Sequence, residues 1–164
     1  MRNFFEQLNP KSFQITCILA CLFGDLSFAT YIYQIFSNKK AYMETFNLIK
    51  GPLKESFKQQ GLVLPPNIEH EFFQVMIQTL MLALSLFILA HGLIYFFYWL
   101  KKRFAFLYIR FMAILGAFGA LIFCFGSSQN GILWPIFFFC VFLAYIFVLS
   151  GTHYFPISRK SNQE

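Results

Sequence analysis

Long apolar runs separated by shorter polar segments dominate the pattern along this chain. The runs cover residues 12–36, 72–99, 104–125 and 132–155. Each run has at least the roughly 20 residues that an α-helix needs to cross the hydrocarbon core of a bilayer. The sequence therefore predicts an all-α membrane protein with four transmembrane helices in an antiparallel bundle, which form a single domain over residues 1–164.

Local signals mark where several of these helices begin and end. Asn9 followed by Pro10 is typical of a helix start, with asparagine as the cap and proline in the first turn. Lys101–Lys102–Arg103 leaves room only for a tight turn, so we expect the second and third helices to be antiparallel neighbours. Pro156 is expected to stop the last helix, and the tail Met1–Leu8 is expected to lie on the membrane surface.

The polar segment 37–71 carries an amphipathic helical pattern. Its apolar residues recur at spacings of four, three, four and four, at Tyr42, Phe46, Ile49, Leu53 and Phe57. The pair Gly51–Pro52 interrupts the pattern and predicts two short helices or one kinked helix. We interpret the segment as an extramembrane loop that rests on the membrane interface or on the end of the bundle. The sharper hypothesis is that the apolar stripe is a docking surface for a partner.

Composition supports lipid as the surrounding medium. Hydrophobic residues make up 58% of the chain and charged residues only 12%, about half the charged share of an ordinary soluble domain. The 25 Phe and 8 Tyr fall largely inside the apolar runs, which indicates lipid-facing bulk. The net charge of +6 does not indicate nucleic acid, because the basic residues flank the apolar runs as helix-end anchors do.

The basic residues also predict an orientation in the membrane. If the termini share one side, that side holds seven basic residues, whereas the loop 37–71 holds five lysines. The positive-inside rule then favours cytoplasmic termini in a multi-pass protein of the plasma (inner) membrane. The seven are Arg2, Lys11, Lys101, Lys102, Arg103, Arg159 and Lys160.

Small and polar residues share one face on each apolar helix, and we expect the four faces to meet in a common interior. The four sets are, in chain order, Gln14, Cys21, Asp25 and Ala29; Gln74, Gln78, Ser85 and Gly92; Arg110, Ala113, Ala117 and Cys124; and Cys140, Ala144 and Gly151.

Asp25 is the most unusual residue, because an ionised carboxylate inside a bilayer is costly. It is expected to be protonated, to accept a hydrogen bond from Ser85 or a glutamine, or to pair with Arg110. Arg110 has the competing option of reaching back to the headgroups. His91 lies about 140° from the Gln78–Ser85 stripe on its helix, so it is expected to face another neighbour, a second subunit or lipid.

Reactive motifs are absent from the sequence. There is no HExxH, no GxSxG, no glycine-rich phosphate loop and no paired metal-ligand spacing, so no catalytic residue, metal or cofactor is predicted. The cysteines Cys17, Cys21, Cys124 and Cys140 all lie in apolar runs and are interpreted as inert packing residues.

Three classes of function remain open. The first is a non-catalytic tetraspan subunit that stabilises, scaffolds or regulates a membrane assembly, with another membrane protein or a second copy as partner. The second is an oligomeric channel or transporter that uses Asp25 and the stripe of Gln74, Gln78 and Ser85 as a polar path. The third is a small membrane enzyme acting on a lipid or quinone, with Asp25, His91 and Arg110 as its polar groups.

Overall fold

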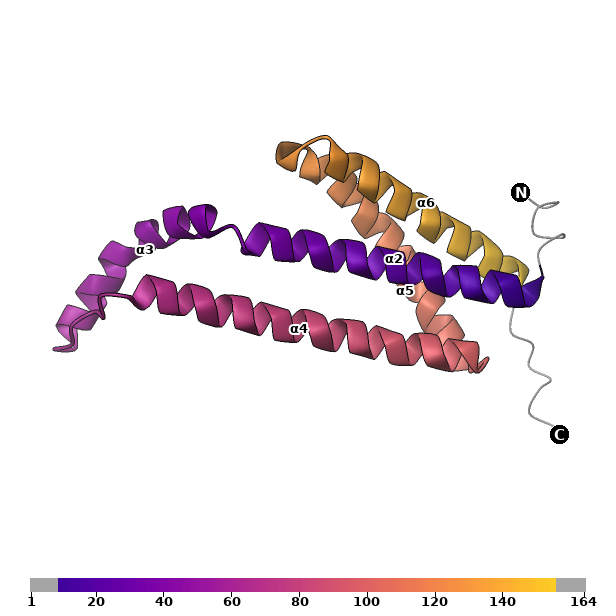
Figure 1. Ribbon diagram of the computed structural model, residues 1–164, viewed down its shortest axis with the longest axis horizontal. Coiled ribbons are helices and arrows are strands. Elements are labelled where there is room, and N and C mark those ends of the chain that lie inside the picture. Colours follow the sequence, from indigo (N-terminus) through magenta and orange to yellow (C-terminus); the bar gives the residue numbers. More distant parts are fainter. Residues whose placement is uncertain (1–8, 156–164) are drawn as a thin grey trace. The chain divides into compact units, whose positions relative to one another are not determined.

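A computed structural model describes residues 9–155 of the chain, apart from the side chains of residues 129 and 130. Its described part is entirely helical, and Figure 1 shows the helices in chain order. Their bounds are α2 Pro10–Phe36, α3 Lys39–Gln59, α4 Ile68–Trp99, α5 Arg103–Gly126, η1 Ser127–Asn130 and α6 Leu133–Tyr154. The predictions for the tail Met1–Leu8, for Pro156 and for the basic residues Arg2, Arg159 and Lys160 lie outside the described residues.

Four of these helices, α2, α4, α5 and α6, are long and apolar enough to cross a membrane. They coincide with the four apolar runs, and α4 begins four residues earlier than predicted, at Ile68 rather than residue 72. Much of their surface is exposed within the chain and apolar, which suits contact with lipid tails. These helices are consistent with a multi-pass membrane protein.

Capping interactions confirm the expected helix start at Asn9–Pro10. Asn9 Oδ1 accepts a hydrogen bond of 3.0 Å from the Lys11 backbone N–H, and α2 begins at Pro10. Asn38 caps α3 in the same way, with its Oδ1 3.2 Å from the backbone nitrogen of Ala41. Both side chains satisfy donors that have no partner inside the first turn of a helix.

The chain divides into two compact units, and the first comprises Ala29–Phe87. In this unit α3 is one continuous helix with Pro52 inside it, so the two-helix alternative is wrong. The rings of Tyr42 and Phe73 lie 5.0 Å apart, and those of Phe46 and Phe72 lie 6.4 Å apart. Aromatic side chains at the start of α4 therefore occupy part of the α3 apolar stripe.

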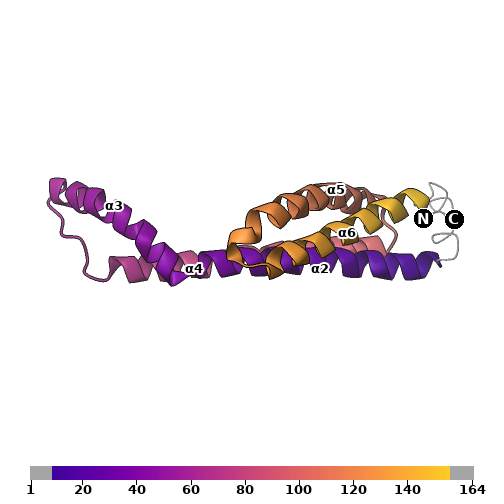
Figure 2. The same ribbon diagram turned by 90° about the horizontal axis from the view of Figure 1, so that it is seen from above.

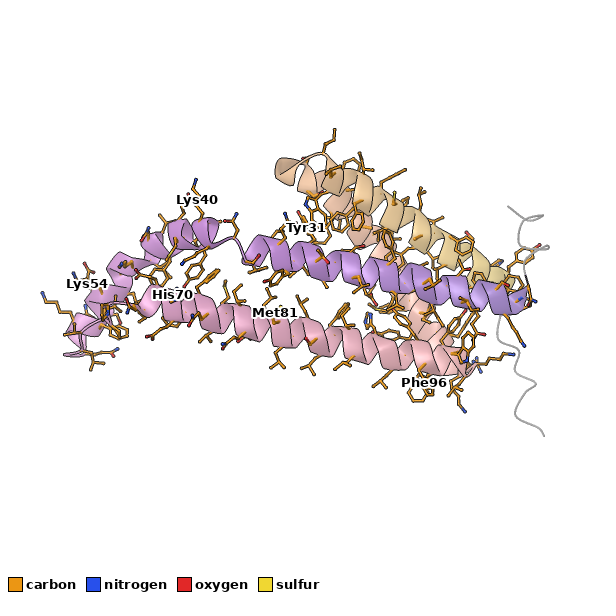
Figure 3. All side chains as sticks on the ribbon, in the orientation of Figure 1. Tyr31, Lys40, Lys54, His70, Met81 and Phe96 are labelled. Carbon is orange, nitrogen blue, oxygen red and sulfur yellow. The ribbon has the colours of Figure 1, made fainter. Side chains whose placement is uncertain are left out.

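Charged residues complete the contact between α3 and α4 in this unit. Lys50 Nζ lies 3.2 Å from Glu69 Oε2. Partial burial and the nearby Glu69 carboxylate raise the pKa of Tyr42. Lys40 and Lys54 are exposed and project outward from α3, as Figure 3 shows.

The expected docking surface is accordingly smaller than the sequence suggested. Phe46 is only 5% exposed and Tyr42, Leu53 and Phe57 are half-buried, whereas Ile49 is exposed. The chain itself covers part of the stripe, and the docking hypothesis stays a prediction, with Ile49 as the exposed residue of the stripe.

The second unit contains the residues up to Phe28 together with those from Ile88 onward. In it α5 and α6 run side by side, joined through η1, as Figures 1 and 2 show. Small side chains on α5 permit this close approach. They are Ala105, Ala113, Ala117 and Ala120, all buried. The α6 side of the interface is built from larger residues, namely Phe138, Val141, Tyr145 and Val148.

The turn between α4 and α5 forces an unusual backbone conformation on Lys101, whose φ is 57°. A left-handed conformation costs a side-chain-bearing residue about 1–2 kcal/mol, whereas glycine adopts it freely. Lys101→Gly is therefore expected to raise the free energy of unfolding by about 0.5–1 kcal/mol, after allowing for the larger entropy of glycine in the unfolded chain. Equilibrium unfolding in detergent–lipid mixtures measures this difference.

The neighbouring Lys102 is the matched control for this substitution, because its φ of −72° suits any residue. Lys102→Gly removes the same charge without relieving strain and should not stabilise the protein. Equal stabilisation by both variants would show that the removed charge, not the backbone, is responsible.

Candidate functional site

The second unit contains a buried hydrogen-bonded network centred on Asp25 of α2. Asp25 Oδ2 lies 2.8 Å from Nδ1 of His91 on α4, and each of the two side chains is 6% exposed. The hydroxyl of Tyr95, one turn further along α4, donates a hydrogen bond to the same carboxylate oxygen. Because His91 and Tyr95 are four residues apart, both project from one face of α4 toward α2.

The network continues from His91 to α5. Nε2 of His91 lies 3.0 Å from the hydroxyl of Tyr108, so both ring nitrogens of His91 are engaged. The Tyr108 ring meets the imidazole edge-on, with ring centroids 5.8 Å apart at an angle of 84°. Asp25, His91 and Tyr108 therefore link three helices, α2, α4 and α5, through two hydrogen bonds.

Tyr145 of α6 fills the space beside this network. Its phenol lies directly over Gly24, where an added Cβ would overlap the hydroxyl. An added Cβ at Gly116 of α5 would lie 2.6 Å from the same ring. The two glycines thus make a slot that admits one aromatic side chain, beside the residue that precedes Asp25.

Next to the network along α2, polar groups also find partners. Gln14 Nε2 donates to the carbonyl oxygens of Tyr98 and Trp99, at 2.6 and 3.1 Å. These carbonyls end α4 and have no partner within that helix, so Gln14 caps it. Cys17 is fully buried beside Cys21 and Tyr98.

This arrangement has the chemistry of an oriented acid–base group. A carboxylate that bonds to one imidazole nitrogen fixes the ring and its tautomer, and the other nitrogen then faces a hydroxyl. The same bonds also satisfy polar groups that have no water around them in a bilayer. The geometry can therefore tie helices together, carry a proton, or do both.

Of the six polar residues singled out from the sequence, the structure joins only Asp25 and His91. Arg110 is exposed and makes no ion pair with any described residue, so the alternative in which it pairs with Asp25 is not seen. Gln74, Gln78 and Ser85 are exposed and lie in the other compact unit, Ala29–Phe87. Gln74 instead bonds to His70, one turn away.

The face predictions are partly correct on α2, where Gln14 and Ala29 are half-buried, and on α6, where Gly151 of the predicted stripe is buried. Cys21 and Asp25 are buried on α2, as are Ala113 and Ala117 on α5. On α6 the interior is built from Tyr145 and its bulky neighbours, whereas Cys140 of the predicted stripe is exposed. A prediction that the smallest residues mark the buried face of a helix is wrong where a tyrosine or a histidine fills the interior.

Three functional candidates, Tyr95, Tyr108 and Tyr145, were missed by the sequence analysis. A signal for the first exists, because His91, Tyr95 and Tyr98 recur at spacings of four and three on one face of α4. Tyrosine combines a large apolar ring with one hydroxyl, so it suits a buried position whose polar partner lies on another helix. Nothing in the sequence singles out Tyr108 or Tyr145 from the other tyrosines.

No group of three His, Cys, Asp or Glu side chains among residues 9–155 is arranged so that it could hold a metal ion. Comparisons with protein-family models, with curated proteins and with solved structures find no match to this chain.

Proposed function

We propose that the chain is a non-catalytic tetraspan protein that serves as a structural, scaffolding or regulatory subunit of a membrane assembly. Its four apolar helices form an antiparallel bundle in the plasma membrane, with both termini in the cytoplasm and α3 outside the membrane. Its partner is another membrane protein or a second copy of the chain.

The observation that carries this proposal is the closure of the Asp25 network. Asp25 shares a hydrogen bond with His91 and accepts one from Tyr95, and Tyr108 engages the second ring nitrogen of His91. Polar groups that bond to one another across helices stabilise helix association in a bilayer. The buried polar groups Asp25 and His91 are thus used to hold the chain's own helices together.

The outer surfaces support a role in assembly. Spanning helices expose leucine and phenylalanine, such as Phe96 on the outward face of α4 in Figure 3. The helix α3 exposes Leu48 and Ile49 beside its lysines, with Leu48 80% exposed. An exposed apolar patch on an extramembrane helix suits contact with lipid or with a partner protein.

Extraction of the tagged full-length chain in native nanodiscs tests the proposal. We expect discs that contain more than one protein chain, counted by single-molecule photobleaching and by cross-linking mass spectrometry. Ile49→Glu should lower that number if α3 forms the contact. Gln59→Glu is the matched control, because it adds the same charge at another exposed position of α3.

Discs that hold strictly one copy of this chain and no other protein would contradict the proposal. Reconstitution into liposomes addresses the conducting alternative directly. A proton or cation flux that disappears in Asp25→Asn would replace the scaffold by a channel or transporter.

A further inference from the structure

The Asp25–His91 pair lies deep along its helices. His91 is eight residues before Trp99, the end of α4, which corresponds to about 12 Å of helix. Asp25 is fifteen residues after Pro10, the start of α2, or about 22 Å. A hydrocarbon core of about 30 Å would enclose both groups. Two ionisable side chains thus share surroundings from which bulk water is excluded.

The titratable groups around the pair come from every helix of this unit. Tyr95 of α4 bonds to Asp25 and Tyr108 of α5 bonds to His91, while Cys21 lies one turn before Asp25 on α2 and Tyr145 of α6 packs on the adjacent Gly24. All four are thiols or phenols, which carry no charge in their protonated form. Since Arg110 is exposed and does not pair with Asp25, His91 is the one base in contact with the carboxylate among residues 9–155.

Charge balance determines how many protons the pair holds. An ionised Asp25 beside a neutral His91 would leave a net negative charge in the hydrocarbon, which is strongly unfavourable. Two forms of the pair have no net charge: a carboxylic acid with an imidazole, and a carboxylate with an imidazolium. Each of them contains one proton more than an ionised Asp25 beside a neutral His91. In each of them one proton lies in the 2.8 Å bond between Oδ2 and Nδ1, and the second lies on Nε2.

We propose that the Asp25–His91 pair is a proton-binding site, that its second proton resides on His91 Nε2, and that this proton exchanges through the hydroxyl of Tyr108. The ligand is the proton itself. The site goes beyond the scaffold role, because the helices remain tied in either protonation state.

Tyr108 is suited to this exchange by its position. Its hydroxyl is 3.0 Å from Nε2, and its side chain is half-buried, whereas His91 and Tyr95 are buried. It also lies five residues after Arg103, about 8 Å from the basic turn that begins α5. Tyr108 is therefore the least buried member of the network, and it lies within two helical turns of the basic segment between α4 and α5.

The exchange step balances in atoms and charge. The N–H bond of Nε2 breaks as its proton bonds to the Tyr108 oxygen, and the former phenolic proton leaves to a water at the helix end. The water becomes a hydronium ion and the Asp25–His91 pair is transiently left with one negative charge, which its unfavourable burial makes short-lived. In that transient state Nε2 carries a lone pair and accepts a hydrogen bond from the regenerated Tyr108 hydroxyl. The reverse sequence reloads the site, and the 3.0 Å contact serves both states.

Solid-state NMR of the unaltered full-length chain in liposomes tests where the proton resides. The chain has three histidines, so ¹⁵N-histidine labelling gives few signals, and His91→Gln assigns the relevant one. We expect the Nε2 of His91 to be protonated at neutral pH, with its N–H as donor to Tyr108. An unprotonated Nε2 would overturn the proposal, and this result does not depend on the stability of any tyrosine variant.

Hydrogen–deuterium exchange of the His91 Nε2–H signal tests the route. Removing a positioned proton carrier should slow a proton transfer on the order of 100-fold. In Tyr108→Phe we therefore expect the His91 Nε2–H to exchange about 100-fold more slowly than in the unaltered chain. Tyr98→Phe is the matched control, since Tyr98 is a buried tyrosine of α4 that bonds to neither Asp25 nor His91, and it should exchange as the unaltered chain does.

Two outcomes would reject the route through Tyr108. One is an unchanged exchange rate in Tyr108→Phe, and the other is equal slowing in both tyrosine variants. Thermal unfolding of the same samples identifies any slowing or acceleration that stems from a loosened fold. Neither the NMR measurement nor the exchange measurement depends on the oligomeric state. A result that contradicts the proton site is therefore distinguishable from one that contradicts the scaffold role.

Discussion

Replacing His91 by leucine is expected to lower the free energy of unfolding by about 3 kcal/mol. The substitution leaves the Asp25 carboxyl group buried with Tyr95 as its remaining hydrogen-bond donor. Removing one partner of a buried pair lowers the free energy of unfolding by more than the intact pair contributes to it. The reason is that the remaining polar group loses its hydrogen-bond partner and stays out of contact with water. Equilibrium unfolding in lipid bicelles, followed by steric trapping or by mild denaturant, measures the loss.

The double variant Asp25→Leu with His91→Leu separates this explanation from simple loss of packing. With both polar groups gone, no unsatisfied group remains, so most of the lost stability should return. The double variant should therefore be more stable than His91→Leu alone, which is the signature of coupled residues in a double-mutant cycle.

Arg110→Gln and His153→Leu are the controls for the first prediction. Both residues are exposed, so each change is expected to stay within about 0.5 kcal/mol of the unaltered chain. A loss in His91→Leu no larger than in these controls would show that the network does not stabilise the helices. A large loss in Arg110→Gln would restore the Asp25–Arg110 tie.

Closing the slot for Tyr145 is expected to produce the second large effect. Gly24→Ala and Gly116→Ala should each lower the free energy of unfolding by about 2–3 kcal/mol, because each Cβ occupies space that the Tyr145 ring fills. The ring cannot easily move away, since the two glycines lie on different helices and both contact it. Unfolding curves of the two variants give the measurement.

Two further variants show whether the steric explanation holds. Gly92→Ala is the matched control, because an added Cβ there meets nothing within 4 Å. It should raise stability by roughly 0.5–1 kcal/mol, as alanine favours a helix over glycine. In a Tyr145→Leu background the cost of Gly24→Ala should shrink; an unchanged cost would place the clash elsewhere.

The site was only half predictable from the sequence, and the residues show why. Asp25 is conspicuous because a carboxylate in an apolar run is rare and requires a partner. Its partner could not be identified, because the periodicity of α4 gives two candidate inner faces. One contains Gln74, Gln78 and Ser85, and the other contains His91 and Tyr95.

The choice between these faces depends on complementarity with α2. Imidazole and phenol groups reach across to a carboxylate and also bury a ring. The α6 interior illustrates the same principle, because Tyr145 needs the slot made by Gly24 and Gly116 on two other helices. Neither fit is encoded within a single helix.

The sequence by itself determined the number, length and approximate ends of the four apolar helices. The physical reason is local: a run of about 20 apolar residues in lipid must satisfy its backbone hydrogen bonds internally, and a helix does so. Only the tertiary structure decided which face of each helix is buried and which groups surround Asp25. Those choices depend on the shapes and hydrogen-bonding groups of neighbouring helices, which are far away along the chain.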